Sequence, residues 1–101
     1  ARPTAVICAN DVLAMGAVTE CHAQKVAVPA AMSVTGFDDI EAASILVPAL
    51  TTVRVPMREL GCAAAQQMLA RLNGEAGVKV TELAVDLIVR GTTAPPRAGN
   101  R

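Results

Sequence analysis

The sequence predicts an α/β protein with a mainly parallel sheet and flanking helices. Short apolar runs rich in β-branched residues recur along the chain, and stretches with helical apolar spacing separate them. Pro, Gly, Asn or Asp mark most of the junctions. Strands and helices that alternate in this way form parallel sheets with right-handed crossovers. Phe37 is the only aromatic residue, so we expect an aliphatic core.

The elements follow from this patterning in chain order. Four apolar runs have the length and composition of buried strands. The predicted strands are 4–9, 32–37, 50–55 and 83–90. Between them, apolar residues recur at a spacing close to 3.6. The predicted helices are 12–24, 40–46 and 57–73, of which the second is a short turn.

Local signals support the helix boundaries. Asn10 opens an N-cap signal before the first helix. Gly16 lies inside that helix, which predicts close packing there. Pro56 suits the first position of the last helix, where its missing N–H costs nothing, and Asn73-Gly74 is a C-cap signal.

Composition excludes several classes of protein. The 101 residues carry nine basic and nine acidic side chains without a basic stripe, so we expect no direct nucleic-acid contact from them. Three Cys without C-x-x-C spacing argue against a disulfide scaffold and for a reducing, cytoplasmic setting. No apolar run is long enough for a membrane span, so no membrane partner is expected. The chain lacks an initiator Met and begins almost on a strand, which predicts a piece of a longer protein.

Two polar residues follow the first two predicted strands. Asn10 comes directly after the first strand and Asp38 directly after the second. The carboxyl ends of parallel strands share one edge of a sheet, where open α/β proteins bind their ligands. A carboxylate accepts hydrogen bonds only, whereas an amide both donates and accepts. Together they suit a neutral polyol such as a sugar.

The alternative for such residues is helix capping. It is the commoner role for Asn10, Asp11 and Asp39, whereas Asp38 fits capping and ligand binding equally. We therefore predict Asp11 and Asp39 as helix caps, and both roles, cap and ligand contact, stay open for Asn10 and Asp38.

Catalytic and metal-binding patterns are weak. His22 is the only histidine and has no partners at metal-ligand spacing. The sequence contains neither a G-x-S-x-G elbow nor a glycine-rich phosphate loop. Asp38-Asp39 lacks the further carboxylates and the Lys of a Mg²⁺-dependent phosphotransfer site. We expect neither an enzyme nor a bound cofactor or metal.

Three segments together resemble the lactose/galactose-repressor (LacI/GalR) family. They are 3–18 (PTAVICANDVLAMGAV), 33–69 (SVTGFDDIEAASILVPALTTVRVPMRELGCAAAQQML) and 87–96 (LIVRGTTAPP). The distinctive features are a strand ending in Ala-Asn-Asp, a strand ending in Gly-Phe-Asp-Asp and then Pro-x-Leu-Thr-Thr-Val. The resemblance covers nearly the whole chain.

The resemblance implies a transcription repressor with a periplasmic-binding-protein-like core. In this family a helix-turn-helix headpiece binds DNA, and the ligand lies between two subdomains of the core. Residues 1–93 correspond to part of this effector-binding domain, and the headpiece lies outside the chain. Residues 3–52 fall in the C-terminal subdomain, and about 56–88 pack on the N-terminal one. The closing strand then returns to the C-terminal subdomain. We expect the tail 94–101 to be disordered.

The resemblance also implies roles for single residues. Asn10 and Asp38 correspond to contacts with a small-molecule effector of the sugar or nucleoside class. Family homodimers pair through positions that map onto Met15, Ile45 and Leu46. The last two belong to the apolar run 40–50, for which burial in the core is the alternative. The family often has a C-cap Gly where this chain has Lys25, so that turn is expected to differ.

Two other functions remain open at this point. A periplasmic sugar-binding protein of a transporter would share the fold and the cleft. The three Cys and the run from Gly-Phe-Asp-Asp to Leu-Thr-Thr-Val argue against it. A hydrolase or phosphotransfer enzyme would use Asp38 as its key residue.

Overall fold

The computed structural model describes residues 2–75, 77 and 80–96 of the chain. The chain divides into two compact units, Ala1–Arg54 with Asp86–Arg101, and Val55–Val85. The first unit holds β1 (Ala5–Ile7), α1 (Asp11–Ala23), β2 (Ser33–Thr35), α2 (Glu41–Ile45), β3 (Thr52–Arg54) and β4 (Asp86–Ile88). The second unit holds α3 (Met57–Leu72). Each element lies within or beside its predicted range, but the strands pair over only three residues each.

The strands of the first unit follow one another in sequence order. β1 pairs with β2 in parallel, and β3 pairs with β4 antiparallel. Two isolated parallel bridges, Thr35 to Thr51 and Asp38 to Arg54, place β3 beside β2. The predicted parallel arrangement therefore holds from β1 to β3. β4 runs the other way because the chain re-enters this unit at Asp86 and pairs directly with the strand by which it left.

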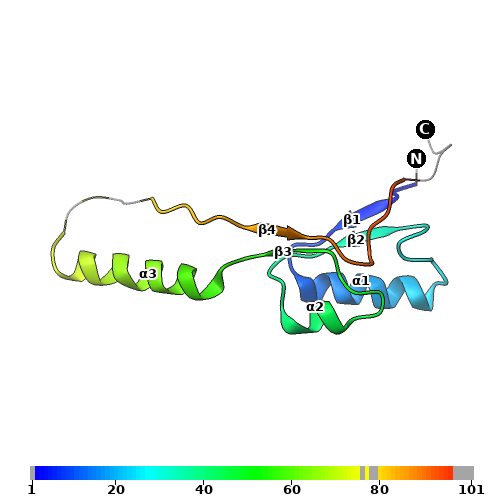
Figure 1. Cartoon of the computed structure of the whole chain (residues 1–101), viewed down its shortest axis with the longest axis horizontal. Coiled ribbons are helices and arrows are strands. Elements are labelled where there is room, and N and C mark those ends of the chain that lie inside the picture. Colours follow the sequence, from blue (N-terminus) through cyan, green and yellow to red (C-terminus); the bar gives the residue numbers. More distant parts are fainter. Residues whose placement is uncertain (1, 76, 78–79, 97–101) are drawn as a thin grey trace. The chain divides into compact units, whose positions relative to one another are not determined.

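A small aliphatic core lies between the strands and the two helices of the first unit. α1 and α2 lie on one face of the strands (Figure 1). Among the described residues, five apolar side chains are fully buried between these layers: Ala14, Val18, Val34, Ala43 and Leu50. The side chain of Ile7, on β1, is 86% exposed. Apolar surface thus remains open on β1 within the described part of this unit.

Helix α1 ends in a Schellman motif without glycine. The Val26 N–H donates to the Cys21 carbonyl at 2.7 Å, and the Lys25 N–H donates to the His22 carbonyl at 3.1 Å. Lys25 occupies the left-handed position with φ +57°. The turn therefore keeps the geometry that favours glycine, and a lysine adopts it.

Gly16 does not have the close packing that its place in α1 predicts. No atom lies within 4 Å of the position that a Cβ would occupy there. The prediction was wrong because Gly16 faces away from the core, on the exposed side of the helix.

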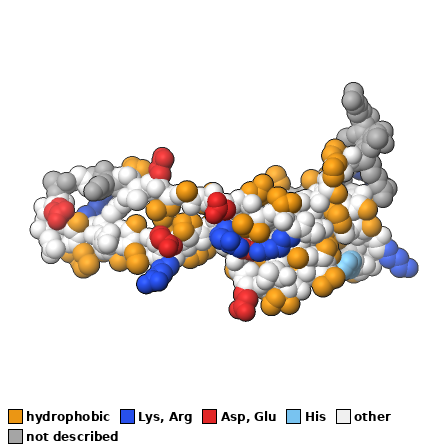
Figure 2. Space-filling view, in the orientation of Figure 1, with side chains coloured by type: hydrophobic (Ala, Val, Ile, Leu, Met, Phe, Trp, Pro, Cys, Tyr) orange, Lys and Arg blue, Asp and Glu red, His pale blue; other side chains and the backbone are white. Residues whose placement is uncertain are grey.

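Helix α3 of the second unit carries an apolar surface that this unit does not bury. Pro56 is its N-cap rather than its first residue, and Gly74 follows its C-cap with φ +82°, as the C-cap signal predicts. None of the residues of α3 is buried, and Leu72 is 75% exposed. Apolar side chains are visible along this helix in Figure 2. No described helix is both long and apolar enough to cross a membrane.

The predicted disordered tail begins with an ordered residue. The Ala94 N–H donates to Ser33 Oγ at 3.1 Å, and the Ser33 hydroxyl donates to the Ala94 carbonyl at 3.2 Å. The prediction was wrong at Ala94 because this reciprocal pair ties it to β2. Residues 97–101 lie outside the described part of the chain.

Candidate functional site

Asn10 and Asp38 occupy matching positions beyond the carboxyl ends of β1 and β2. Ile7 is the register partner of Thr35, and each polar residue comes three positions after its own partner. The Asp11 N–H donates to the Phe37 carbonyl at 2.9 Å, so the two segments stay together past the strands. The two candidate residues therefore follow neighbouring parallel strands at one edge of the sheet.

Asn10 is the N-cap of α1. Its Oδ1 accepts a hydrogen bond from the Leu13 N–H at 2.9 Å, and its backbone is extended. The capping interpretation of Asn10 is therefore correct. Its Nδ2 has no hydrogen-bond partner among the described residues, so the amide can still donate to a ligand. The ligand contact of Asn10 stays a prediction.

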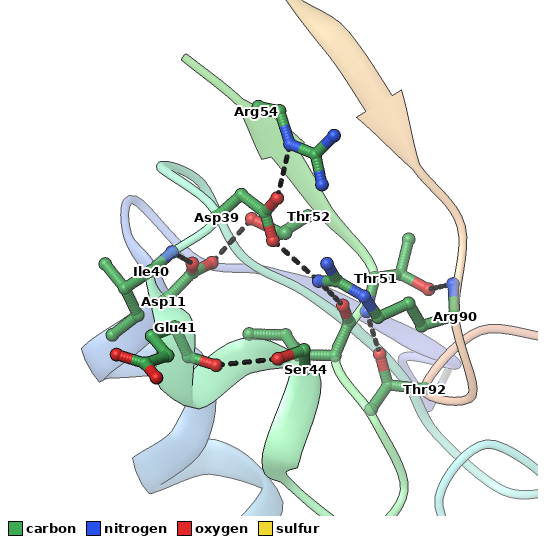
Figure 3. Close-up of polar contacts among 11 residues, drawn as sticks. Asp11, Asp39, Ile40, Glu41, Ser44, Thr51, Thr52, Arg54, Arg90 and Thr92 are labelled. Carbon is green, nitrogen blue, oxygen red and sulfur yellow. Dashed lines mark hydrogen bonds and ion pairs between the residues drawn. The ribbon is translucent and has the colours of Figure 1, made fainter. Parts of the chain in front are cut away.

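Asp11 is a buried bridge and not the cap of α1. It is the first residue of the helix and is 1% exposed. Its Oδ2 accepts from the Ile40 N–H at 2.8 Å, and its Oδ1 accepts from the Thr52 hydroxyl at 2.5 Å (Figure 3). The cap prediction was wrong because Asn10 takes the cap position and the Asp11 side chain points into the interior. It joins α1 to β3 and to the start of α2.

Asp39 is an ion-pair centre and not the cap of α2. Ile40 holds the N-cap position, and no side chain caps it. The Asp39 carboxylate lies 2.7 Å from Arg54 Nε and 2.7 Å from Arg90 Nη1, and its side chain is 6% exposed (Figure 3). The cap prediction was wrong because two guanidinium groups bind the carboxylate instead.

The ion pairs change the acidity of Asp39. The hydrogen bond from Arg90 is the main cause that holds the pKa of the Asp39 carboxyl below its ordinary value. Burial acts in the opposite direction, and Arg54 adds to the lowering. Asp39 therefore stays ionised at neutral pH and holds both guanidinium groups.

Asp38 combines a strained backbone with an unpaired carboxylate. Its φ is +105°, and that of Asp39 is +58°. Non-glycine residues in such regions cost about 1–3 kcal/mol each and concentrate at functional sites. The Asp38 N–H donates to the Val53 carbonyl at 2.9 Å. The half-buried Asp38 carboxylate makes no hydrogen bond or ion pair with any described residue.

A threonine network fixes the segment after β4 that carries Arg90. The Thr51 N–H donates to Thr92 Oγ1 at 2.9 Å, and the Thr92 hydroxyl donates to the Val34 carbonyl at 2.7 Å. The Arg90 N–H donates to Thr51 Oγ1 at 2.9 Å, and its Nη1 donates to the Leu50 carbonyl at 3.0 Å. No buried side-chain polar atom in the described part of the chain is left without a partner.

Arg54 and Arg90 were not among the residues predicted from the sequence. A single Arg on or beside a strand gives no signal beyond that of an exposed charge. The one signal that could have found them is that both lie in segments resembling the repressor family, Arg54 in Leu-Thr-Thr-Val-Arg and Arg90 in Leu-Ile-Val-Arg.

The predicted dimer residues differ in exposure. Ile45 is 69% exposed, and Met15 is half-buried. Leu46 is half-buried and packs against the core of its own unit. Val47, next to it, is 81% exposed. Of the three predicted residues, Ile45 offers the most free apolar surface.

Other parts of the first unit do not contribute to this site. A groove at the amino ends of β1 and β2 is lined by residues that include Arg2, Lys25 and Met32, but neither Asn10 nor Asp38. Among the residues that the structure describes, His, Cys, Asp and Glu form no group of three that could hold a metal ion.

Comparison with known proteins identifies the family of the chain. The family described as periplasmic binding protein-like domain matches residues 1–93. The HTH-type transcriptional repressor PurR of Proteus mirabilis is 39% identical over 94 residues, which cover 92% of this chain and 28% of that protein. The chain thus spans less than a third of the length of this curated relative.

Solved structures show the same relationship. A LacI family transcriptional regulator from Mycobacterium smegmatis matches with a TM-score of 0.86 and 38% identity, over 94% of this chain and 35% of that one. The Lac repressor dimer bound to operator and the anti-inducer ONPF matches with a TM-score of 0.82 and 36% identity, over 92% of this chain and 32% of that one. These matches confirm the resemblance to the lactose/galactose-repressor family and the predicted fold class. The chain belongs to the family of periplasmic-binding-protein-like domains.

Proposed function

We propose that this chain is the effector-sensing part of a DNA-binding transcriptional repressor. It binds a small hydroxyl-rich molecule, a sugar or a nucleoside, at the carboxyl edge of the sheet. One observation carries the proposal: Asp38 holds a carboxylate without a partner among the described residues, in a strained backbone conformation, at the position after β2 that matches the position of Asn10 after β1.

The chemistry of the two side chains favours a neutral polyol. The Asn10 Oδ1 already accepts from Leu13, so this side chain has its Nδ2 left to donate. The Asp38 carboxylate only accepts, and it repels anions. A hydroxyl group can donate to Asp38 and another can accept from Asn10, which suits adjacent hydroxyls of a sugar. Binding of this kind needs no chemical step, so the proposal assigns no enzymatic activity.

The relatives support the repressor role over that of a transporter subunit. PurR is an HTH-type transcriptional repressor, and the Lac repressor structure is a dimer on its operator. By analogy, DNA binding belongs to a headpiece outside these 101 residues, and the protein acts in the cytoplasm. The effector acts through its different affinities for two conformations of the dimer.

We further propose that the homodimer forms through Met15, Ile45 and Leu46. The high exposure of Ile45 and Val47 supports this surface. Met15 is on α1, Ile45 is the last residue of α2, and Leu46 is the C-cap of α2. Both helices begin next to the candidate site, since Asn10 caps α1 and Asp11 bonds to the first turn region of α2. A change at the site can therefore reach the dimer surface through these helices.

A thermal-shift screen of the complete protein that contains this chain tests the proposal. The compounds are D-glucose, D-galactose, D-ribose, cellobiose, adenosine and cytidine. A binder present at 100 times its Kd stabilises the protein by about 2.7 kcal/mol. Asp38→Asn should reduce this stabilisation, because a neutral amide oxygen accepts a hydrogen bond from the ligand more weakly than the carboxylate does.

The matched control is Glu41→Gln. Glu41 is an exposed neighbouring carboxylate whose side chain makes no hydrogen bond with a described residue. This variant should respond as the wild type does. A compound that stabilises the wild type and the Asp38→Asn variant equally would overturn the site assignment.

A further inference from the structure

The loop between β2 and α2 is anchored on both sides of Asp39 through its own backbone N–H groups. The Asp38 N–H donates to the Val53 carbonyl, and the Ile40 N–H donates to the Asp11 carboxylate. The Phe37 carbonyl accepts from the Asp11 N–H. β3 and α1 therefore fix the residues before and after Asp39.

Asp39 itself is held by its side chain. Both of its carboxylate oxygens are engaged, Oδ2 by Arg54 Nε and Oδ1 by Arg90 Nη1, each at 2.7 Å (Figure 3). These are charge-assisted hydrogen bonds, the stronger kind in proteins. Arg90 is fixed in turn by the Leu50 carbonyl. The carboxylate thus connects the loop to β3 and to the segment after β4.

The two ion pairs of Asp39 with Arg54 and Arg90, together called the clamp here, also affect the backbone of Asp38. Asp38 and Asp39 are consecutive residues with positive φ, a conformation that persists only where surrounding contacts impose it. The contacts of Asp39 are those of its side chain, whereas Asp38 keeps its own carboxylate unpaired among the described residues. The Asp39 carboxylate is therefore bound by two arginines, whereas the Asp38 carboxylate is left available to a ligand.

We infer that Asp39 is a positioning residue: its carboxylate, clamped by Arg54 and Arg90, holds Asp38 in the left-handed conformation that presents an unpaired carboxylate to the effector. The inference rests on the proposed function for the identity of the ligand class. A carboxylate that is already fixed loses less conformational freedom on binding, so the clamp raises affinity without touching the ligand.

The first test needs no ligand. It measures hydrogen–deuterium exchange of the peptide spanning residues 36–41 in the complete protein. Asp39→Asn should exchange there about tenfold faster than wild type. The loss of a charge-assisted contact makes local opening of the loop more frequent, and exchange occurs from the open state. Peptides of the core around Val18 and Val34 should be unchanged, and so should the 36–41 peptide of Glu41→Gln.

A second variant covers the case in which Asp39→Asn does not fold. Arg54→Met keeps an apolar stem of similar length at a side chain that is 55% exposed, and it removes one half of the clamp. It should also accelerate exchange of the 36–41 peptide. Wild-type exchange of this peptide in the folded variants would overturn the inference, as would acceleration spread equally over the core peptides.

The second test separates positioning from general stabilisation. It measures the affinity for each of the six compounds named above, in a double-mutant cycle with Asp38→Asn. Asp39→Asn should weaken binding about tenfold when Asp38 is present and have no further effect in the Asp38→Asn background. Equal weakening in both backgrounds would show that Asp39 acts on the fold alone. If none of the six compounds binds the wild type, the proposed ligand class fails, while the exchange measurement still decides the role of Asp39.

Discussion

The carboxylate of Asp11 fills the space into which a side chain at Gly36 would project. A Cβ built on Gly36 would overlap Asp11 Oδ1 and lie 3.0 Å from Leu50 Cδ2. The same Oδ1 accepts the hydroxyl of Thr52. The glycine of the Gly-Phe-Asp-Asp run therefore leaves room for a buried carboxylate that joins α1 to β3.

Gly36→Ala should lower the free energy of unfolding by about 1–3 kcal/mol, the usual cost of overpacking a core site. The added methyl group must displace the Asp11 carboxylate or the Leu50 side chain. Gly16→Ala is the control, since it adds a methyl group to open space in α1 and should stabilise by about 0.5–1 kcal/mol. Urea denaturation of both variants checks the opposite signs. A neutral Gly36→Ala would mean that Asp11 is not confined as described.

Lys25→Gly should stabilise the protein by about 1 kcal/mol, because Lys25 has φ +57° in the Schellman motif and glycine adopts this conformation without strain. Gly74→Ala, at φ +82° after α3, should destabilise by a similar amount. Thermal unfolding of the two variants measures both effects. A lower melting temperature for Lys25→Gly would show that the lysine side chain stabilises this turn.

The ion pairs of Asp39 should make the free energy of unfolding depend on pH in the acid range. Its pKa in the folded protein lies below that in the unfolded chain, chiefly through the hydrogen bond from Arg90. The unfolded chain therefore binds this proton more readily. The ionised Asp39 carboxylate contributes fully to the free energy of unfolding above about pH 5. This contribution is lost as the pH falls below about 4 and passes the lower pKa of the folded state. Unfolding experiments from about pH 5 down to below about pH 4 should give a steeper loss of stability with falling pH for the wild type than for Asp39→Asn. Parallel slopes would contradict the ion pair.

Asp38→Gly should separate stability from function. Glycine adopts φ +105° without strain, so the free energy of unfolding should rise by about 1 kcal/mol, while the response to the effector is lost with the carboxylate. Denaturation and thermal-shift measurements on the same preparation test both parts. A fall in stability would show that the Asp38 carboxylate stabilises the fold rather than serving a ligand.

Ile45→Glu should weaken self-association without reducing the stability of the monomer. The side chain of Ile45 is 69% exposed, so a charge there affects a partner and not the core of its own unit. Leu46 is a poorer probe, since it packs on that core. Sedimentation velocity of the complete protein measures the change. An unaltered dimer would exclude Ile45 from the interface.

The patterning of the sequence determined the elements and their order. Apolar runs, helical spacing and the signals at Asn10 and Gly74 predicted each helix and strand, because these signals are local. The Gly-Phe-Asp-Asp and Leu-Thr-Thr-Val runs, together with Ala-Asn-Asp, indicated the resemblance to the repressor family. The direction of β4 was beyond local patterning, because an apolar run has the same composition whichever way it pairs.

Only the tertiary structure decided what each polar residue after β1 and β2 does. Asn10, Asp11, Asp38 and Asp39 all follow strands and all fit the description of a helix cap. The fold makes Asn10 the cap, buries Asp11 against Thr52, engages Asp39 with two arginines, and leaves the Asp38 carboxylate unpaired among the described residues. Arg54, at the end of β3, and Arg90, just after β4, reach Asp39 from segments distant in sequence. A carboxylate takes its role from the donors around it, and strand pairing brings those donors there.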